Sequence, residues 1–126
     1  MPKQSTRILA VVEDLFFIVK ISDSAKRAGL VCEFLKSADL VLEKTQAEAP
    51  LMVIVDLNSN AVNGVDLISR LRAVEGLKGL SIIAFVSHVQ GELKQQAQDA
   101  GAMVLARSAF SVSLPQILKR HSGSPV

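Results

Sequence analysis

The apolar run at residues 51–55 constrains the fold of this chain more than any other stretch. Leu, Met, Val, Ile and Val follow one another and lead directly into Asp56. A short apolar run rich in β-branched residues is typical of a strand that is buried on both faces of a parallel sheet. In open α/β sheets, ligands bind outside the carboxyl ends of the strands. The sequence therefore predicts that Asp56 lies at the ligand-binding edge of such a sheet.

Two other apolar runs also end in oxygen-bearing side chains. Residues 8–12 are followed by Glu13 and Asp14, and residues 82–86 are followed by Ser87. Because the carboxyl ends of parallel strands meet at one edge of a sheet, we expect the three acidic side chains to converge there, with Ser87 nearby.

Strand-like and helical patterns alternate along the whole chain. Strands are expected at about 7–12, 30–35, 51–56, 81–86 and 102–106. Helices are expected at about 15–28, 38–49, 64–74, 90–100 and 112–120. Because right-handed crossovers place successive strands parallel in one sheet, this alternation predicts a three-layer α/β sandwich.

Several residues are expected to mark element boundaries. Gly29 suits the left-handed cap that closes the first helix, and Ser37 can cap the second helix. Pro50 blocks the continuation of the second helix, and Pro115 is expected in the first turn of the last helix, where its missing N–H is tolerated. Glu33 interrupts the second strand, which predicts an exposed edge position for that strand.

Length and charge limit the classes of protein to consider. The 126 residues are expected to form one domain (residues 1–126), with a core at about 7–120 and a loose tail at 121–126. The 14 basic and 12 acidic residues give a net charge of +2 without a long basic run, which argues against nucleic acid and a membrane surface as direct partners. No stretch approaches the roughly 18 apolar residues of a membrane span, so a cytoplasmic protein is expected.

Cys32 is the only cysteine, which excludes an internal disulfide and a multi-cysteine metal site. It lies in a short apolar segment, and the interpretation we favour is a small buried hydrophobe rather than a reactive thiol.

The acidic set at the predicted sheet edge suits a divalent cation. Glu13, Asp14 and Asp56 would repel one another at neutral pH unless another charge offset them. Mg²⁺ can do this with one or two carboxylates, a carbonyl and several waters. With a metal present, Asp56 could attack a phosphoryl donor, and Ser87 could donate a hydrogen bond to a phosphoryl oxygen. The alternative is that these acids only solvate the rim of the sheet or cap helices.

Several short motifs occur in a fixed order along the chain. They are the acidic pair Glu13-Asp14, then Asp56, Asn58, Gly64, Ser87 and the segment 100–102. In this order and spacing the sequence resembles the receiver domain of two-component response regulators, over about residues 7–120. The resemblance implies a flavodoxin-like α/β sandwich, with a parallel sheet of five strands in the order 2-1-3-4-5 and five helices.

The resemblance also implies roles for individual residues. Asp56 would be the phospho-acceptor, supplied by a histidine kinase or phosphotransfer protein, and Ser87 would be the switch hydroxyl. Mg²⁺ would be held by Glu13, Asp14, Asp56 and the backbone carbonyl of Asn58. A downstream protein target would bind the face formed by the fourth helix, the fifth strand and the fifth helix. Enzymatic activity is expected only as self-phosphorylation and dephosphorylation of Asp56.

The segment after the last strand departs from the family pattern. Receivers normally carry a Lys-Pro pair there, and the matching residues of this chain are Ser108 and Ala109. Arg107 lies one residue earlier, where strand alternation predicts that it points to the opposite side of the sheet, although a slip of one residue could bring it into the site. Leu105 stands where an aromatic switch residue is usual. The sequence thus predicts an atypical receiver that lacks the usual lysine.

An apolar pair beside the acidic residues is also unusual. Leu15 and Phe16 follow Asp14 directly, where polar residues are more common. Packing of this pair against the loop after the fifth strand is the interpretation we favour, and a partner-binding patch is the alternative.

Three functions are compatible with these observations. The leading hypothesis is a stand-alone receiver-like signalling module that is phosphorylated on Asp56, since too few residues follow the last helix to form an output domain. The second is a docking or adaptor domain that works without phosphorylation. The third is a small Mg²⁺-dependent phosphatase, although no glycine-rich phosphate loop follows the first strand and Asn58 stands where such enzymes carry a second Asp.

Overall fold

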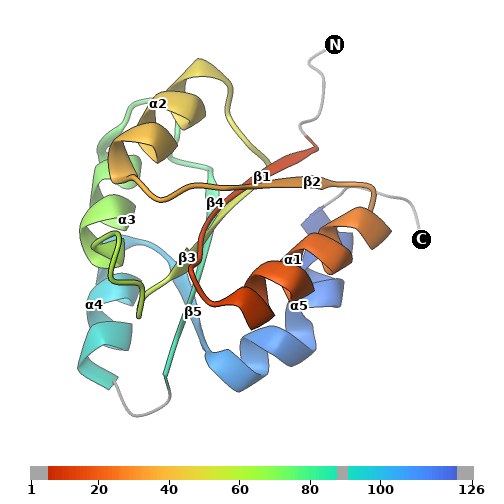
Figure 1. Cartoon of the computed structure of the whole chain (residues 1–126). Helices are drawn as coiled ribbons and strands as arrows, with labels where there is room; N and C mark the ends of the chain where they lie inside the picture. Colours follow the sequence, from red (N-terminus) through yellow and green to blue (C-terminus); the bar gives the residue numbers. More distant parts are fainter. Residues whose placement is uncertain (1–5, 88–90, 122–126) are drawn as a thin grey trace.

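The computed structural model describes residues 6–87 and 91–121 and shows one five-stranded parallel sheet (Figure 1). Its strands are β1 (Arg7–Val11), β2 (Val31–Phe34), β3 (Met52–Asp56), β4 (Ser81–Val86) and β5 (Met103–Ala106). They are paired in the order β2-β1-β3-β4-β5, and every pairing is parallel. The flavodoxin-like strand order expected from the resemblance is confirmed.

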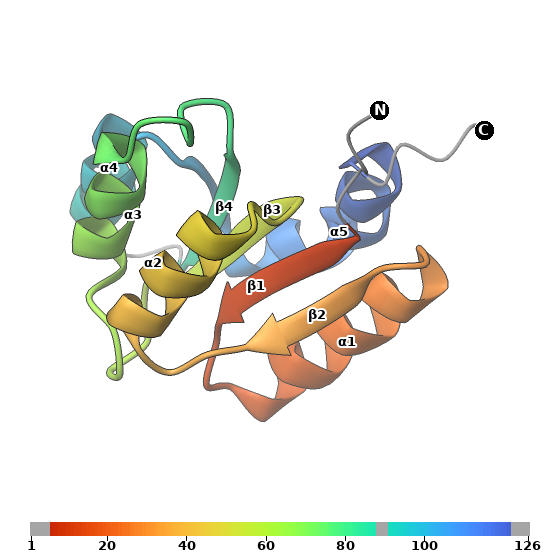
Figure 2. The ribbon, with the colours of Figure 1, turned by 90° about the horizontal axis from the view of Figure 1, so that it is seen from above.

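Helices cover both faces of this sheet. They are α1 (Leu15–Arg27), α2 (Ala38–Ala47), α3 (Gly64–Ala73), α4 (Gly91–Ala100) and α5 (Arg107–His121). Figures 1 and 2 show α1 and α5 on one face, and α2, α3 and α4 on the other. The predicted three-layer sandwich is therefore observed.

The central strand β3 is buried along its whole length. Met52 and Ile54 contribute to the core beneath α1 and α5, whereas Val53 and Val55 contribute to the core beneath α2, α3 and α4. All four residues have 0% exposure. Burial on both faces explains why this strand is an uninterrupted apolar run. Because the strand is packed on both sides, the position of Asp56 at its end is fixed.

Local signals in the sequence set several boundaries as predicted. Gly29 follows α1 with a φ of +76°, a left-handed conformation that favours glycine. The Ser37 hydroxyl caps α2 and accepts a hydrogen bond from the backbone N–H of Leu40 at 3.3 Å. At the edge of the sheet, Glu33 of β2 forms an ion pair with Lys44 of α2 at 3.0 Å. The edge position that Glu33 predicted for its strand is confirmed.

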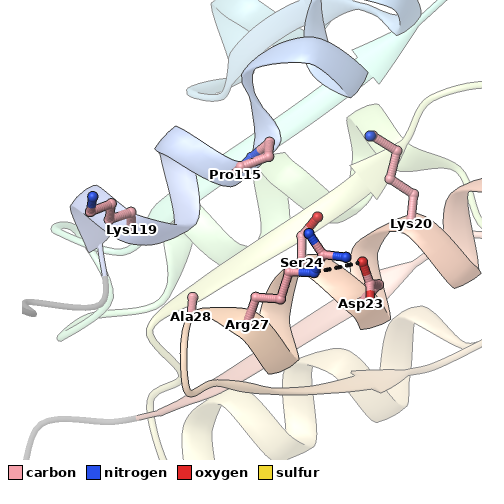
Figure 3. A pocket seen from close by; sticks show the side chains of 7 residues that line it. All are labelled: Lys20, Asp23, Ser24, Arg27, Ala28, Pro115 and Lys119. Carbon is pink, nitrogen blue, oxygen red and sulfur yellow. Dashed lines mark ion pairs between the residues drawn. The ribbon is translucent and has the colours of Figure 1, made fainter.

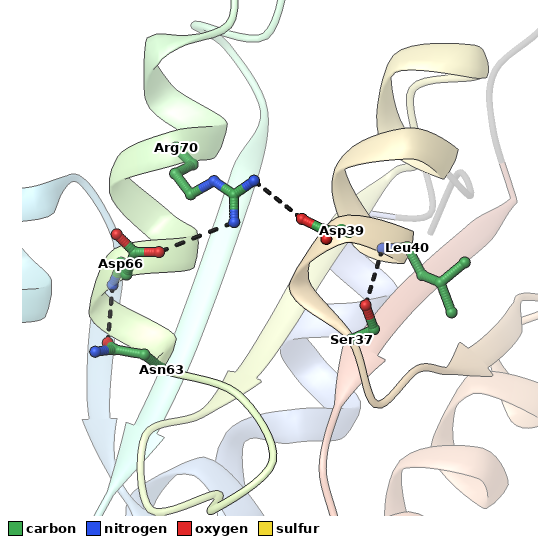
Figure 4. A network of polar contacts seen from close by, with 6 residues as sticks. All are labelled: Ser37, Asp39, Leu40, Asn63, Asp66 and Arg70. Atoms are coloured by element: carbon green, nitrogen blue, oxygen red, sulfur yellow. Dashed lines mark hydrogen bonds and ion pairs between the residues drawn. The ribbon is translucent and has the colours of Figure 1, made fainter.

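Polar contacts on the surface join α2 and α3 (Figure 4). Asn63 caps α3 and accepts a hydrogen bond from the backbone N–H of Asp66 at 3.0 Å. Arg70 of α3 reaches Asp39 of α2 at 3.1 Å and lies 4.0 Å from Asp66 of its own helix. Asp39, Asn63, Asp66 and Arg70 are exposed to solvent.

The last helix differs from the prediction. It begins at Arg107 rather than at residue 112, so Pro115 lies in its middle and not in its first turn. The helix forms despite this proline because Phe110 and Leu114, both at 0% exposure, pack one turn apart against the sheet. Pro115 itself is on the exposed side of the helix. Packing of the apolar face outweighs the loss of one backbone hydrogen bond.

Two expectations concern residues whose structure is not described. The predicted start of the fourth helix at residue 90 and most of the predicted loose tail, residues 122–126, lie outside the described ranges. Within residues 6–87 and 91–121, none of the helices combines the length and apolar character that a membrane span needs.

Candidate functional site

Asp56 is the last residue of β3 and lies at the carboxyl edge of the sheet, as predicted. The residue is only 4% exposed, and in the sheet it is aligned with Phe85 of β4. Its Oδ1 accepts a hydrogen bond from the backbone N–H of Asn58 at 2.9 Å. This bond fixes the direction of a buried carboxylate at the end of the strand.

The Asn58 side chain links the turn after β3 to the end of β4. Its Oδ1 accepts a hydrogen bond from the backbone N–H of Ser87 at 2.9 Å. Sequence analysis considered only the backbone carbonyl of Asn58 and missed this side-chain role. Ser87 itself is half-buried and directly follows β4, as predicted. The two strand ends that carry Asp56 and Ser87 are thus connected through one amide.

Glu13 turns toward the loop between β3 and α3. Its Oε1 accepts three hydrogen bonds, from the Ser59 hydroxyl at 2.7 Å and from the backbone N–H groups of Asn60 at 2.9 Å and Ala61 at 3.1 Å. The carboxylate therefore holds the loop that follows Asp56. Its interaction with the loop could not be read from the sequence, because the two segments are far apart along the chain.

Asp14 serves both a helix and an ion pair. Its Oδ1 accepts a hydrogen bond from the backbone N–H of Phe16 at 2.8 Å and caps α1. Its Oδ2 lies 2.9 Å from Nη2 of Arg107. Arg107 therefore reaches the site, which was the alternative to the direction that strand alternation predicted. β5 ends at Ala106, so Arg107 belongs to the first turn of α5, and the alternation of a strand no longer sets its direction.

An aromatic cluster lies against the Arg107 guanidinium. The guanidinium carbon is 4.8 Å from the centre of the Phe17 ring and 5.7 Å from that of Phe85, both within reach of a cation–π interaction. Phe17 stacks on Phe85 at 4.8 Å, and Phe85 stacks on Phe110 at 4.4 Å. Phe110 is fully buried. Helices α1 and α5 and strand β4 thus build one platform for the cation.

The three carboxylates, Asn58 and Arg107 line an open cavity of about 300 Å³ at the carboxyl edge of the sheet. Its lining residues are Glu13, Asp14, Asp56, Asn58, Ser59, Asn60 and Arg107. Among the described residues there is no cluster of three His, Cys, Asp or Glu side chains arranged to hold a metal ion. Glu13 is hydrogen-bonded to the loop, and Asp14 is paired with Arg107.

Burial raises the pKa of the Asp56 carboxyl above its usual range. The hydrogen bond from the Asn58 backbone and the charge of Arg107 act in the opposite direction, and the carboxylates of Asp14 and Glu13 add to the rise. The pKa of Glu13 is instead lowered, first by the Ser59 hydroxyl and then by the backbone N–H groups of the loop. Two carboxyls of one cavity therefore have pKa values shifted in opposite directions.

Comparison with protein families decides the assignment. The profile of the response regulator receiver domain matches residues 8–106, which include nearly all of the sheet and helices α1 to α4. The chain belongs to the response regulator receiver family. Receiver domains are in general signalling modules of two-component systems rather than enzymes, so the match does not favour a small phosphatase.

Solved structures with the same fold are distant in sequence. The chemotaxis response regulator CheY4 of Vibrio cholerae has 22% identity and a TM-score of 0.77, with 93% of this chain and 98% of that chain covered. The receiver domain of the sensor histidine kinase PA1611 of Pseudomonas aeruginosa, with a magnesium ion coordinated in its active site cleft, has 19% identity and a TM-score of 0.78 over 95% of this chain and 99% of that one. A signal receiver domain of a histidine kinase from Syntrophus aciditrophicus has 16% identity and a TM-score of 0.79, covering 94% and 90%. None of the curated protein sequences is significantly similar to this chain.

Ser108 is the residue that the sequence prediction placed where receivers normally carry a lysine. It is exposed and lies in the first turn of α5. Arg107 instead supplies a cation to the cavity. The sequence signal for this position of Arg107 is the spacing of Phe110 and Leu114, which lie one helical turn apart in the same core cluster. That spacing indicates that α5 begins before Phe110.

The apolar pair after Asp14 is left in solvent. Leu15 is 76% exposed and Phe16 is 64% exposed. The expectation that they pack against the loop after β5 is wrong, because the neighbouring Phe17 takes the core position on α1 and turns the pair outward.

A larger cavity of about 470 Å³ lies between α1 and α5 (Figure 3). It is lined by Lys20, Asp23, Ser24, Arg27, Ala28, Pro115 and Lys119. Arg27 pairs with Asp23 at 3.1 Å within α1. None of the strand-end acids lines this cavity, so it is separate from the Asp56 site.

Cys32 shows no sign of a reactive thiol. It packs against the core beneath α1 and α5, and burial raises the pKa of its thiol to about 12. The small-hydrophobe interpretation is consistent with this packing.

Proposed function

We propose that this receiver accepts a phosphoryl group on Asp56, with Mg²⁺ as cofactor, and signals by contact with another protein. The observation that supports the proposal is the position of Asp56, a buried carboxylate at the floor of a cavity that also holds two carboxylates and a guanidinium. A nucleophile needs a cation nearby to approach a negatively charged phosphoryl donor. Arg107 brings such a charge to the cavity even though the usual lysine is missing.

The oxygen-rich lining of the cavity fits a hard divalent cation. Mg²⁺ prefers oxygen ligands and keeps several waters, so one or two carboxylates are enough and no cluster of three is required. We propose Glu13, Asp14, Asp56 and the backbone carbonyl of Asn58 as the residues that hold it. When bound, the ion would neutralise charge on the oxygens of the transferring group.

Asp56 is proposed to act as the nucleophile. Its Oδ1 is held by the Asn58 backbone, which leaves Oδ2 as the oxygen that attacks the phosphorus of the donor. A bond forms between this oxygen and phosphorus, the bond from phosphorus to the leaving group breaks, and the electron pair departs with the leaving group. The product is an acyl phosphate on Asp56. A histidine kinase or a phosphotransfer protein would be the physiological donor.

The signal is proposed to leave through the end of β4. Ser87 would be the switch hydroxyl, and the bond between its backbone and Asn58 already ties this strand end to the turn that follows Asp56. The face formed by α4, β5 and α5 would bind the downstream protein. Met103 and Val112 support this choice, since these apolar residues of β5 and α5 are 56% and 81% exposed. A cytoplasmic location follows from the proposed partners.

Mass spectrometry of the intact protein tests the proposal. After incubation with Mg²⁺ and acetyl phosphate, wild type is expected to gain the mass of one phosphoryl group, and Asp56→Asn is expected to gain none. Asp39→Asn is the matched control, because Asp39 is a solvent-exposed acid of α2 and should leave the adduct unchanged. Absence of an adduct on wild type would contradict the proposal and leave a docking domain that works without phosphorylation.

A further inference from the structure

Arg107 and Asp14 form an ion pair inside the Asp56 cavity. Nη2 of Arg107 lies 2.9 Å from Oδ2 of Asp14, and the two side chains are 30% and 40% exposed. Asp14 is also one of the residues proposed above to hold a divalent cation. The guanidinium therefore sits on an oxygen that the cation would need.

Arg107 can leave Asp14 without losing its aromatic support. Its guanidinium lies over Phe17, which belongs to α1 on the Asp14 side, and near Phe85, which is aligned with Asp56 in the sheet. The two rings stack on each other at 4.8 Å. A guanidinium that releases Asp14 can therefore keep its contact with the rings.

The charges of the cavity favour such an exchange. Three carboxylates line it, and Arg107 is the only basic residue among its described lining residues. A divalent cation carries twice the charge of a guanidinium and binds carboxylate oxygen directly. An arginine, in contrast, is held by hydrogen bonds that a partly solvated site weakens.

We propose that Arg107 and a divalent cation are alternative partners of Asp14, so that Arg107 is an internal competitor that lowers the affinity of the cavity for the cation. This inference rests on the proposed function for the identity of the cation site, but it needs no phosphoryl transfer. Arg107 is a positioning residue in this scheme, and it releases Asp14 when the cation binds.

Calorimetric titration with Mg²⁺, without any phosphodonor, measures the competition. An ion pair worth about 1 kcal/mol corresponds to about a fivefold change in affinity. Arg107→Gln is therefore expected to bind Mg²⁺ about fivefold more tightly than wild type. Arg70→Gln is the matched control, because it removes a similar Arg–Asp pair whose residues do not line the cavity, and it should leave the affinity unchanged.

A double-mutant cycle separates competition from a general effect of charge. If Arg107 acts by occupying Asp14, Arg107→Gln does not raise the affinity for Mg²⁺ in a protein that already carries Asp14→Asn. An equal gain in both backgrounds would mean that Arg107 only adds a repulsive field, and no gain in either would mean that it does not oppose the cation. Either result overturns the proposal.

The Arg107 side-chain NMR signal gives a second measurement, which decides the question if Asp14→Asn binds Mg²⁺ too weakly for calorimetry. The Nε–Hε resonance of Arg107 is expected to shift on saturation of wild type with Mg²⁺, while that of Arg70 stays in place. An unchanged Arg107 resonance in the Mg²⁺-bound protein overturns the proposal. A wild type that binds Mg²⁺ but forms no acyl phosphate contradicts the proposed function alone.

Discussion

Two Arg–Asp pairs of this protein have similar lengths and very different surroundings. Arg107 and Asp14 lie 2.9 Å apart in the cavity, with side chains 30% and 40% exposed. Arg70 and Asp39 lie 3.1 Å apart on the surface between α3 and α2, with side chains 44% and 86% exposed (Figure 4). The first pair lies against aromatic rings and next to a buried carboxylate, whereas the second is surrounded by water.

The difference shows that distance alone says little about what an ion pair does. Water screens an exposed pair, and such pairs contribute about 0–1 kcal/mol. Arg107 interacts in addition with two rings, and its charge opposes the rise in the pKa of the buried Asp56. The surface pair helps to join two helices, but the cavity pair sets the charge of the functional site.

The largest expected effect comes from truncating Phe110, which packs against the two rings beneath Arg107. Phe110 is fully buried and stacks on Phe85 at 4.4 Å. Phe110→Ala is expected to lower the free energy of unfolding by about 3–5 kcal/mol, because it leaves a cavity in the core. Leu40→Ala, on α2 beside the surface pair, is expected to cost less than about 1 kcal/mol. Urea unfolding of the two variants measures both values, and equal costs would contradict the comparison.

The next largest difference in the free energy of unfolding is expected between variants that lack Arg107 and variants that lack Arg70. Arg107→Gln is expected to lower the free energy of unfolding by about 1–2 kcal/mol, because it removes an ion pair together with a cation–π interaction. Arg70→Gln is expected to cost less than about 1 kcal/mol, and this cost should vanish at high salt, where exposed charges are screened. Urea unfolding at low and high ionic strength tests both statements. A larger cost for Arg70→Gln would reverse the ranking of the two pairs.

The pH dependence of stability tests the buried acid beside Arg107. Burial raises the pKa of Asp56 in the folded protein above its usual value of 3.8. Its contribution to stability is therefore fully present below pH 3.8 and is lost as the pH rises through the raised value. At pH 7, Asp56→Asn is expected to raise the free energy of unfolding by about 0.5–2 kcal/mol. This gain should shrink as the pH falls toward 4, and a gain independent of pH would contradict the assignment.

The smallest effect is expected at the loop side of the cavity. The Ser59 hydroxyl is the largest cause of the lowered pKa of Glu13. Ser59→Ala should move this pKa upward toward the usual value of 4.5, as measured by NMR titration of the Glu13 carboxyl carbon. Ser69→Ala, an exposed serine of α3, is the control and should leave it unchanged. If the pKa of Glu13 is unchanged in Ser59→Ala, the backbone N–H groups of the loop are sufficient to keep that pKa low.

Most of the fold followed from local patterns in the sequence. Apolar runs placed the five strands within one or two residues, and Gly29 and Ser37 marked helix ends correctly. The start of α5 was missed because three of the six residues at 108–113 are serines, which have weak helix propensity. Burial of Phe110 against the sheet supplied the stabilisation that the local sequence lacks.

The candidate site was predicted in position but not in its contacts. Placement of Glu13, Asp14 and Asp56 at one edge needed only the rule that parallel strands end together. The partners of these acids come from distant segments, namely the loop at 59–61 and the first turn of α5. Such contacts depend on where two remote backbones meet.

The sequence alone established a parallel α/β sheet with acids at its carboxyl edge, because hydrophobic periodicity and strand ends are local properties of the chain. The direction of Arg107 followed from the tertiary structure, since it depends on the exact residue at which β5 gives way to α5. One residue of helix in place of strand turns this side chain from one face of the sheet to its edge. The change of direction places the Arg107 guanidinium beside Asp14, in a receiver whose sequence lacks the usual lysine.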